Sequence, residues 1–336
     1  MIWLPSLALT LDLLLADPKS LPHPVQAIGL LARLVEKPAR RMKNLVLAGT
    51  LAVFFLLTVT GIAVALLTSL PQGLGLLFSL YFAWSGLALG GLIREGRKAL
   101  AAIELAEKEP RALAQARRAV QMLVSRDTGA MEISELYRSV AESVSENLND
   151  AFVAPWFWLC LGGPVGLWLY KVASTMDSMW GYNNERWGRL GRTAALLDDV
   201  LAFVPARLSV LIMVATAWME RLPWQTEGFP GLARHLRGRE RFSLPGWPGF
   251  AALARQARKS ASPNAGWPMA TAAWLFNGRT GGSTVYDGVI VIKPQMGPQD
   301  GRWEAQNTED LILHVQHAGW AVLASGILLA LPLSLL

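Results

Sequence analysis

The chain has 336 residues, of which 52% are hydrophobic and only 17% are charged, against about 45–50% and about 25% in ordinary soluble domains. This balance argues against an ordinary soluble protein and points to lipid, because the apolar residues are clustered. The excess of 31 Lys and Arg over 25 Asp and Glu is spread over many loops, which argues against nucleic acid as a partner. The single cysteine, Cys160, excludes an intramolecular disulfide framework.

The first apolar segment, residues 1–18, lacks the basic start and small-residue cleavage pattern of a signal peptide. We therefore expect it to stay attached. It leads into a proline-rich turn that presents Asp17 and His23 close together. Proline rigidity favours a preorganised site at this turn, but it suits a plain connection equally well.

A transmembrane hairpin is predicted over residues 44–93. Asn44 to Ser69 and Leu74 to Ile93 contain no charged residue, and a membrane-spanning helix needs about 20 apolar residues. Lys and Arg flank the hairpin on both outer sides, while the link between its helices is short and uncharged. By the positive-inside rule, both outer flanks face the cytoplasm.

Residues 94–150 turn polar and show helical spacing, which predicts a cytosolic helical segment. Near its end, one helix face carries three carboxylates and an amide, from Glu142, Glu146, Asn149 and Asp150. Like charges at this spacing repel unless a cation lies among them, and oxygen ligands suit Mg²⁺. A solvated acidic face is the alternative, although the stripe ends directly at an apolar run.

Residues 151–219 are apolar stretches interrupted by Pro, Gly and charged residues, which predicts broken or re-entrant membrane helices. A dense polar segment lies between them and contains Lys171, Asp177, Tyr182, Asn183, Glu185 and Arg186. Lys171 and Arg186 suit phosphate, and Asp177 suits a metal shell. Interfacial anchoring by the basic and aromatic residues explains part of the segment as well.

Asp198 and Asp199 precede another apolar run, and Arg207 follows about two helical turns later. Charges inside apolar segments usually face a polar cavity or a partner. This helix is therefore predicted to line a pocket, with an internal ion pair as the alternative.

Residues 220–318 are rich in Pro, Gly and Arg, which predicts loops and short helices on the cytosolic side. Two prolines fix a loop that contains Asn264 and Gly266, and the Asn264 amide can both donate and accept hydrogen bonds. The uncharged residues 319–336 form the predicted C-terminal membrane helix.

One late helix face carries Asp310, His314 and His317. The three side chains suit a metal, but no fourth ligand is evident, and a pair between Asp310 and His314 is favoured. No standard nucleotide-binding loop, dinucleotide fingerprint or zinc-protease helix occurs in the sequence. Any nucleotide site must therefore be non-standard.

The predicted fold is all-α. Residues 1–336 are expected to form a single polytopic integral membrane domain with a cytoplasmic helical segment and re-entrant or broken helices.

Five separated motifs follow one another along nearly the whole chain. They are LLADPKSLPHPVQAIG (14–29), AESVSENLNDAFVAPWFW (141–158), LYKVASTMDSMWGYNNERW (169–187), LLDDVLAFVPARL (196–208) and SPNAGWPMA (262–270). Together they resemble the adenosylcobinamide-phosphate synthase family (CbiB/CobD) of cobalamin biosynthesis. Two departures are Ala16, where the family pattern has glycine, and residues 289–308, which fit loosely.

This resemblance implies ATP-dependent amide formation between adenosylcobyric acid and (R)-1-amino-2-propanol or its O-phosphate, with ATP and Mg²⁺ as cofactors. It implies a multi-pass protein of the bacterial inner membrane whose site faces the cytoplasm, with other membrane-associated enzymes of cobalamin assembly as partners. The implied catalytic residues are His23 as proton acceptor, Lys171 and Asp177. The implied metal ligands are Glu142, Glu146, Asp150 and Asp177. The implied substrate or nucleotide contacts are Asp17, Asn147, Tyr182, Asn183, Glu185, Arg186, Asp198, Asp199, Arg207, Asn264 and Gly266.

Two other functions compete with the ligase. A membrane corrinoid transporter or binding protein would also use intramembrane charges and broken helices, although no inverted repeat is evident in the sequence. A non-catalytic scaffold of the same fold would have no need of the acidic and Lys-Asp-Arg motifs, which argue against it.

Overall fold

The chain forms two compact units in a computed structural model. The structure describes residues 2–16, 23–71, 73–182, 184–220, 247–286 and 289–333. Unit 1 comprises Met1–Gly91, Asp150–Pro205 and Leu323–Leu336, and unit 2 comprises Leu92–Asn149 and Ala206–Val322. The predicted site residues Asp17 and Asn183 lie outside the described residues.

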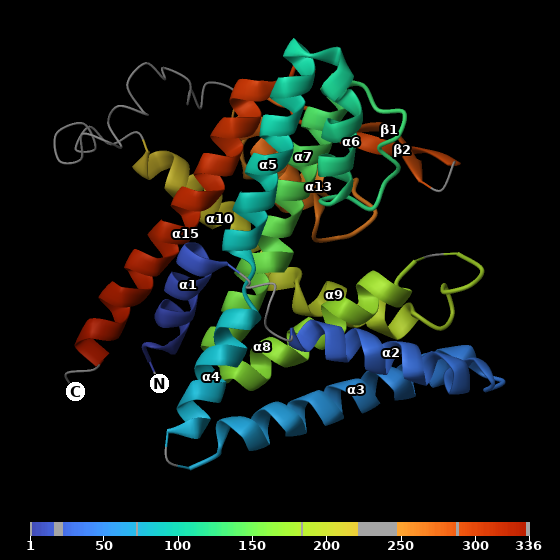
Figure 1. The fold of residues 1–336 in the computed structure, drawn as a ribbon, viewed down its shortest axis with the longest axis vertical. Coiled ribbons are helices and arrows are strands. Elements are labelled where there is room, and N and C mark those ends of the chain that lie inside the picture. Colours follow the sequence, from blue (N-terminus) through green and yellow to red (C-terminus); the bar gives the residue numbers. More distant parts are fainter. Residues whose placement is uncertain are drawn as a thin grey trace. The chain divides into compact units, whose positions relative to one another are not determined.

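Unit 1 is built from helices that pack side by side (Figure 1). Its complete helices are α1 (Leu4–Leu15), α2 (Pro24–Arg40), α3 (Leu45–Thr68), α4 (Leu74–Ser85), α8 (Ala154–Trp180) and α9 (Arg192–Leu201). The long uncharged helix α3 packs against α2, α4, α8 and α9. Only 22% of its apolar stretch is buried, which is typical of a helix that faces lipid.

The predicted single helix from Leu74 to Ile93 is interrupted. α4 ends at Ser85, and α5 (Leu89–Lys108) begins after a short break. The first amides of a helix lack partners within it. Here the Oδ2 atom of Asp12 on α1 accepts hydrogen bonds from the N–H groups of Leu89 and Gly90, at 2.9 and 3.0 Å. This fully buried carboxylate therefore caps α5 from a distant part of the chain.

The sequence predicts broken helices in residues 151–219, and a break is confirmed within α8. Gly163 has φ 60° and ψ −157°, a backbone conformation that residues with a side chain rarely adopt. Pro164 follows it and cannot donate a backbone hydrogen bond. The second half of α8 continues to Trp180, so Lys171 and Asp177 of the polar segment are helical.

Unit 2 combines short amphipathic helices with a small sheet. Its elements include most of α5, η1 (Pro110–Ala112), α6 (Leu113–Gln121), α7 (Ile133–Asn147), most of α10 (Phe203–Met219), α13 (Phe250–Ala257), α14 (Gly266–Leu275), β1 (Thr280–Tyr286), β2 (Val289–Met296) and most of α15 (Ala305–Leu333). The short π-helix η2 (Leu148–Val153) follows α7 across the boundary between the units. The helical spacing predicted from residue 94 onward is confirmed in α5, where Ala99, Ile103 and Ala106 are buried.

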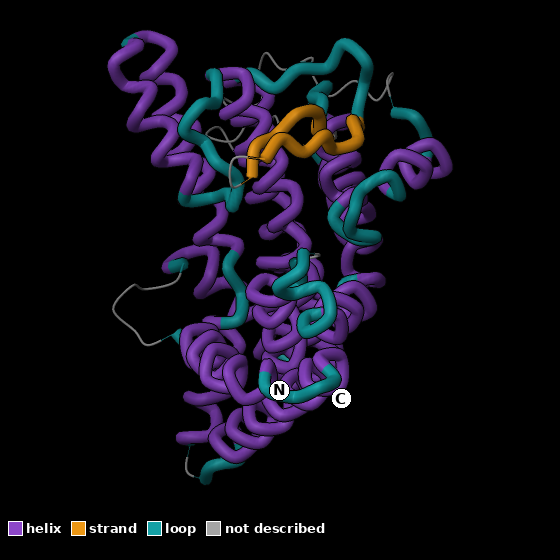
Figure 2. The backbone as a smooth tube through the Cα atoms, turned by 90° about the vertical axis from the view of Figure 1, so that its right-hand side faces the viewer, coloured by secondary structure: helices purple, strands orange, loops and turns teal. Residues whose placement is uncertain are grey.

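The all-α prediction is wrong in one element, the antiparallel hairpin of β1 and β2 (orange in Figure 2). Its first strand holds few large apolar residues, and the loop-like composition of residues 220–318 hid it. The pairing itself stabilises β1, with Thr280 opposite Met296 and Val285 opposite Ile290.

Within the part of the chain that the structure describes, four helical stretches are long and apolar enough to cross a membrane, namely Leu45–Thr68, Leu74–Lys108, Ile133–Trp180 and Ala305–Leu331. A fifth is possible if α9 and α10, which meet at a bend of 41°, form one span. The C-terminal helix begins earlier than predicted. α15 starts at Ala305, which is 14 residues before the predicted start at Gly319. Its first turns carry polar residues, which concealed them in the hydropathy pattern.

Candidate functional site

A cluster of carboxylates lies within unit 1. Asp177 is in the second half of α8, Asp198 and Asp199 are in α9, and Asp150 is in η2. Because α8 packs against α9, these acidic side chains are brought together with Lys171 of α8. We call these five residues the carboxylate cluster.

The members of the carboxylate cluster interact electrostatically. Asp198 senses the charges of Asp150, Asp177, Asp199 and Lys171, and Asp177 senses those of Asp150 and Asp199. Four carboxylates face one ammonium, and all five side chains are only half-exposed. Such an excess of negative charge away from bulk water is costly unless a cationic ligand offsets it.

Asp198 shows this most clearly, because its Oδ1 atom is buried and has no hydrogen-bond partner. Buried carboxylate oxygens are normally satisfied. The arrangement can therefore receive a hydrogen-bond donor or a cation that comes with a substrate.

The predicted resident Mg²⁺ site does not fit the described residues. Among them, no three His, Cys, Asp or Glu side chains converge closely enough to hold a metal ion.

The surroundings of Glu142 are those of a residue that stabilises the fold. It is 2% exposed, and its Oε2 atom forms an ion pair with Arg126 at 2.7 Å. Its Oε1 atom accepts a hydrogen bond from the N–H of Gly281 at 2.7 Å. Both oxygens are thus engaged, and neither the solvated face nor the metal face expected from the sequence describes this residue.

The predicted amide contact Asn147 is held within its own helix. Its side chain donates to the carbonyl and hydroxyl oxygens of Ser143, at 2.9 and 3.2 Å. The oxygen of the Asn147 side-chain amide can still accept a hydrogen bond from a ligand.

Unit 2 brings three predicted substrate contacts together. Arg207 on α10 donates to Asn264 Oδ1 at 2.7 Å and lies over the ring of Trp267 at 4.7 Å. Asn264 is 4% exposed. Gly266 begins α14 directly against the carbonyl oxygen of Ala257, where a side chain would not fit. The SPNAGW motif therefore fixes the Arg207 guanidinium in one orientation.

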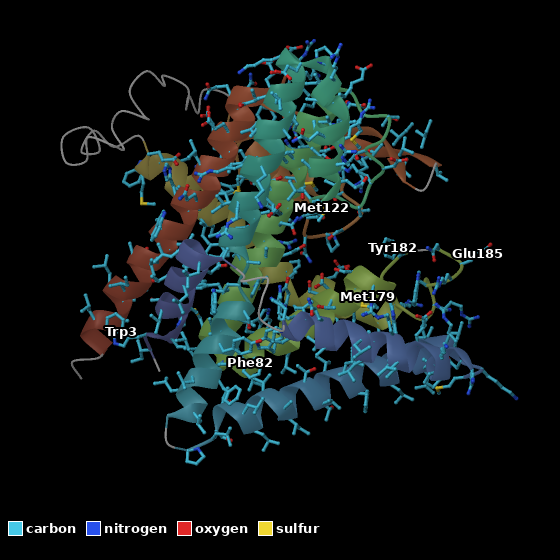
Figure 3. The ribbon with its side chains drawn as sticks, viewed as in Figure 1. Trp3, Phe82, Met122, Met179, Tyr182 and Glu185 are labelled. Carbon is cyan, nitrogen blue, oxygen red and sulfur yellow. The ribbon has the colours of Figure 1, made fainter. Side chains whose placement is uncertain are left out.

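The segment after α8 has other partners. Tyr182 and Glu185 lie on the exposed loop that follows the helix (Figure 3). Arg186 forms an ion pair with Glu36 of α2 at 3.0 Å and packs on Trp187.

His23, the predicted proton acceptor, caps α2. Its Nδ1 atom accepts a hydrogen bond from the N–H of Val25 at 3.3 Å, and its ring lies near that of Trp168. A role in proton transfer must therefore use Nε2, the other ring nitrogen.

The late histidines pair with a residue that the sequence analysis missed. Glu220 contacts Nδ1 of His314 at 3.0 Å and Nδ1 of His317 at 2.7 Å. Burial opposes ionisation of Glu220, but the charge of His314 and the bonds with both imidazoles outweigh it and lower the pKa of Glu220 to about 2. Asp310, which the sequence analysis favoured as the partner of His314, accepts a hydrogen bond from Gln306.

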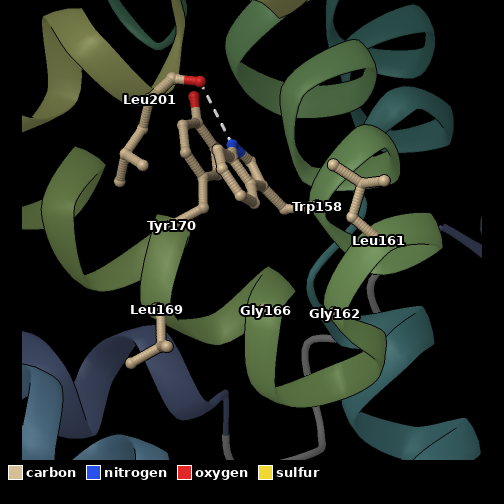
Figure 4. A pocket seen from close by; sticks show the side chains of 7 residues that line it. All are labelled: Trp158, Leu161, Gly162, Gly166, Leu169, Tyr170 and Leu201. Atoms are coloured by element: carbon tan, nitrogen blue, oxygen red, sulfur yellow. Dashed lines mark hydrogen bonds between the residues drawn. The ribbon is translucent and has the colours of Figure 1, made fainter.

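An apolar cavity of about 250 Å³ lies beside the break in α8 (Figure 4). It is lined by Trp158, Leu161, Gly162, Gly166, Leu169, Tyr170 and Leu201. Tyr170 links the cavity to the carboxylate cluster, since it interacts electrostatically with Asp150, Asp177 and Asp198. The sequence analysis missed Tyr170, although its place directly before Lys171 in a polar segment could have indicated it.

These features define the class of the protein, which is a helical membrane protein with a carboxylate cluster among its helices. The chain belongs to the CobD/Cbib family, because the model of this family, described as CobD/Cbib protein, matches residues 5–314. This membership supports a role in cobalamin biosynthesis, as an enzyme of that pathway.

Curated relatives agree with this assignment, and each is named cobalamin biosynthesis protein CobD. The relative from Pelobacter propionicus is 35% identical over 87% of this chain and 84% of its own. The relative from Geobacter metallireducens is 34% identical over 86% and 84%, and that from Leptospira interrogans serovar copenhageni is 30% identical over 93% of each chain. No solved structure matches the chain.

Proposed function

We propose that this chain joins adenosylcobyric acid to (R)-1-amino-2-propanol or its O-phosphate in an ATP-dependent amide ligation. The family resemblance supplies the two organic substrates. The observation that carries the chemistry is the carboxylate cluster, in which four carboxylates face Lys171. Such a group suits a bound cation, such as the Mg²⁺ that accompanies ATP, better than it suits a purely structural role.

Mg²⁺ would enter with ATP as part of the substrate. Triphosphate oxygens and water provide most of the ligands of such an ion, and one or two protein carboxylates complete its shell. This accommodates the finding that no three protein ligands converge among the described residues. Asp150, Asp177 and Asp198 are the candidates for that contact.

The proposed reaction has two steps. A carboxylate oxygen of the corrinoid attacks the γ-phosphorus of ATP, and the bond from this phosphorus to the bridging oxygen breaks, which gives an acyl phosphate and ADP. The amine nitrogen then attacks the acyl carbon, phosphate leaves, and the nitrogen loses a proton. Lys171 would neutralise the transferred phosphate, and Nε2 of His23 is the candidate proton acceptor.

An activity assay tests this proposal. The solubilised protein is given adenosylcobyric acid, aminopropanol phosphate, Mg²⁺ and ATP, and product mass and released ADP or AMP are followed. We expect product from the wild type and from the exposed control Asp300→Asn, and a loss of at least about 100-fold in Asp177→Asn. Wild-type protein that consumes no ATP with both organic substrates present would contradict the ligase.

The break in α8 at Gly163 also suits a corrinoid transporter, because discontinuous helices build transporter sites. The same preparation separates the two functions. Tight corrinoid binding without product would favour transport or binding, whereas product formation would favour the ligase.

A further inference from the structure

Two arginines pack on one tryptophan ring in unit 1. The guanidinium of Arg40, at the end of α2, lies 4.5 Å from the ring centre of Trp187, and that of Arg186 lies 4.7 Å from it. Trp187 also stacks on Trp180 of α8, with ring centres 5.7 Å apart. We call Arg40, Arg186 and Trp187 the arginine–tryptophan cluster. The two steps of the proposed reaction use none of its members, although the family resemblance implies Arg186 as a substrate contact.

One carboxylate holds both guanidiniums. Glu36 Oε1 accepts from Arg40 Nε at 2.8 Å and from Arg186 Nη2 at 3.0 Å. Burial opposes ionisation of Glu36, but its bonds with the two arginines outweigh it and lower the pKa of Glu36. Glu36 therefore stays ionised near neutral pH and compensates only one of the two positive charges.

The surroundings add positive charge. In residues 36–43 and 185–192, seven cationic side chains accompany two carboxylates, a net charge of +5. The cations are Lys37, Arg40, Arg41, Lys43, Arg186, Arg189 and Arg192. Most of these side chains are exposed, and Arg186 is 64% exposed.

The two segments meet at the start of the lipid-facing helix α3. Thr193, next to Arg192, shares a 2.7 Å hydrogen bond with Thr50 in the second turn of α3. Exposed apolar side chains begin on α3 at Leu47 and continue with Leu51 and Phe54. The positive surface thus lies where a membrane span begins, which is the level of lipid headgroups.

We infer that the arginine–tryptophan cluster and the cations around it bind the headgroup of an anionic phospholipid. A guanidinium presents two parallel N–H donors that match phosphate oxygens. Glu36 and the Trp187 ring hold the two guanidiniums in place, which reduces the entropy lost on binding. Amphipathic tryptophans favour the membrane interface as well.

Native mass spectrometry of the full chain in a mild detergent tests this site. The protein is titrated with phosphatidylglycerol or with phosphatidylcholine, and bound lipid and melting temperature are measured. We expect phosphatidylglycerol to bind selectively and to raise the melting temperature. Arg40→Gln and Arg186→Gln should each weaken this binding about fivefold, as expected for one basic residue at an anionic surface. Arg118→Gln, at an exposed position in α6 of unit 2, is the matched control and should bind as the wild type does.

Three results would overturn the inference. They are equal binding of the two lipids, selective binding that both variants retain, and displacement of phosphatidylglycerol by millimolar inorganic phosphate, which would indicate a site for free phosphate. If Arg40→Gln fails to fold, Arg186→Gln alone decides, because that side chain is mostly exposed.

Discussion

At the scale of single residues, the buried carboxylates differ in how their charge is balanced. Glu142 faces Arg126 and a backbone amide, and Asp12 faces two amides at the start of α5. Asp198, which is only partly buried, instead lies among three other carboxylates and a single ammonium group. Balanced charges stabilise a fold, whereas an unbalanced one in a polar cluster is typical of a binding or catalytic site.

Asp198→Asn is therefore expected to separate activity from stability. The change removes one of several mutually repelling charges, so the melting temperature should stay the same or rise. Product formation should fall at least about 100-fold, as for a residue that contacts the reacting groups. Both quantities are measured on the same purified protein. A variant that keeps wild-type activity would remove Asp198 from the site.

Glu142→Gln is expected to show the opposite behaviour. It leaves Arg126 buried without its counter-charge, and breaking a buried pair in this way costs about 3–5 kcal/mol. Thermal unfolding in detergent should show a clear drop, and Arg126→Met together with Glu142→Gln should recover part of it. The Mg²⁺ concentration that gives half-maximal activity should not change. A stable variant that needs more Mg²⁺ would restore the predicted metal role.

At the scale of elements, the sequence predicts local features and misses distant pairings. The uncharged run of α3 and the break near Gly163 follow from residues adjacent in the chain. The cap of α5 by Asp12 joins residues 77 positions apart, and Glu142 binds Gly281 from 139 positions away. No periodicity encodes such pairs, because they depend on which helices come to lie together.

The same reason explains the partial prediction of the site. Asp177, Asp198 and Asp199 were expected as separate motifs, and the packing of α8 on α9 brings them together. The four-residue acidic face could not be judged from spacing alone, because the π-helix η2 changes the helical period after Asn147. Arg126, the ion-pair partner of Glu142, lies outside the motif that contains Glu142 (141–158).

The break in α8 provides a test at this scale. Gly163→Ala places a side chain at a positive φ, which is expected to cost at least about 1–2 kcal/mol. Gly162→Ala is the matched control, because Gly162 has an ordinary φ and open space around it. Thermal unfolding of both variants is compared with the wild type. Equal melting temperatures would mean that the helix is continuous at this point.

At the scale of the whole molecule, the proposed function requires that ATP reach the carboxylate cluster. ATP is cytoplasmic, so the end of α8 and the loop after it must be open to that side. The number of times that residues 151–219 cross the membrane decides this. Helix length and composition alone leave either four or five candidate spans among the described residues.

Cysteine labelling settles the orientation. In a Cys160→Ser background, which removes the single native cysteine, one cysteine is placed at Glu185 after α8 or at Arg118 in α6, both exposed. We expect a membrane-impermeant maleimide to label both in inverted vesicles and neither in intact cells. The ligase needs the loop after α8 in the cytoplasm, and the sequence predicts that residues 94–150, which include α6, are cytosolic. Labelling of Glu185→Cys only from outside would place the loop beside the carboxylate cluster away from ATP. ATP could then not reach the carboxylate cluster, which would contradict the ligase. A transporter, which needs access from both sides of the membrane, would explain the same intramembrane charges better.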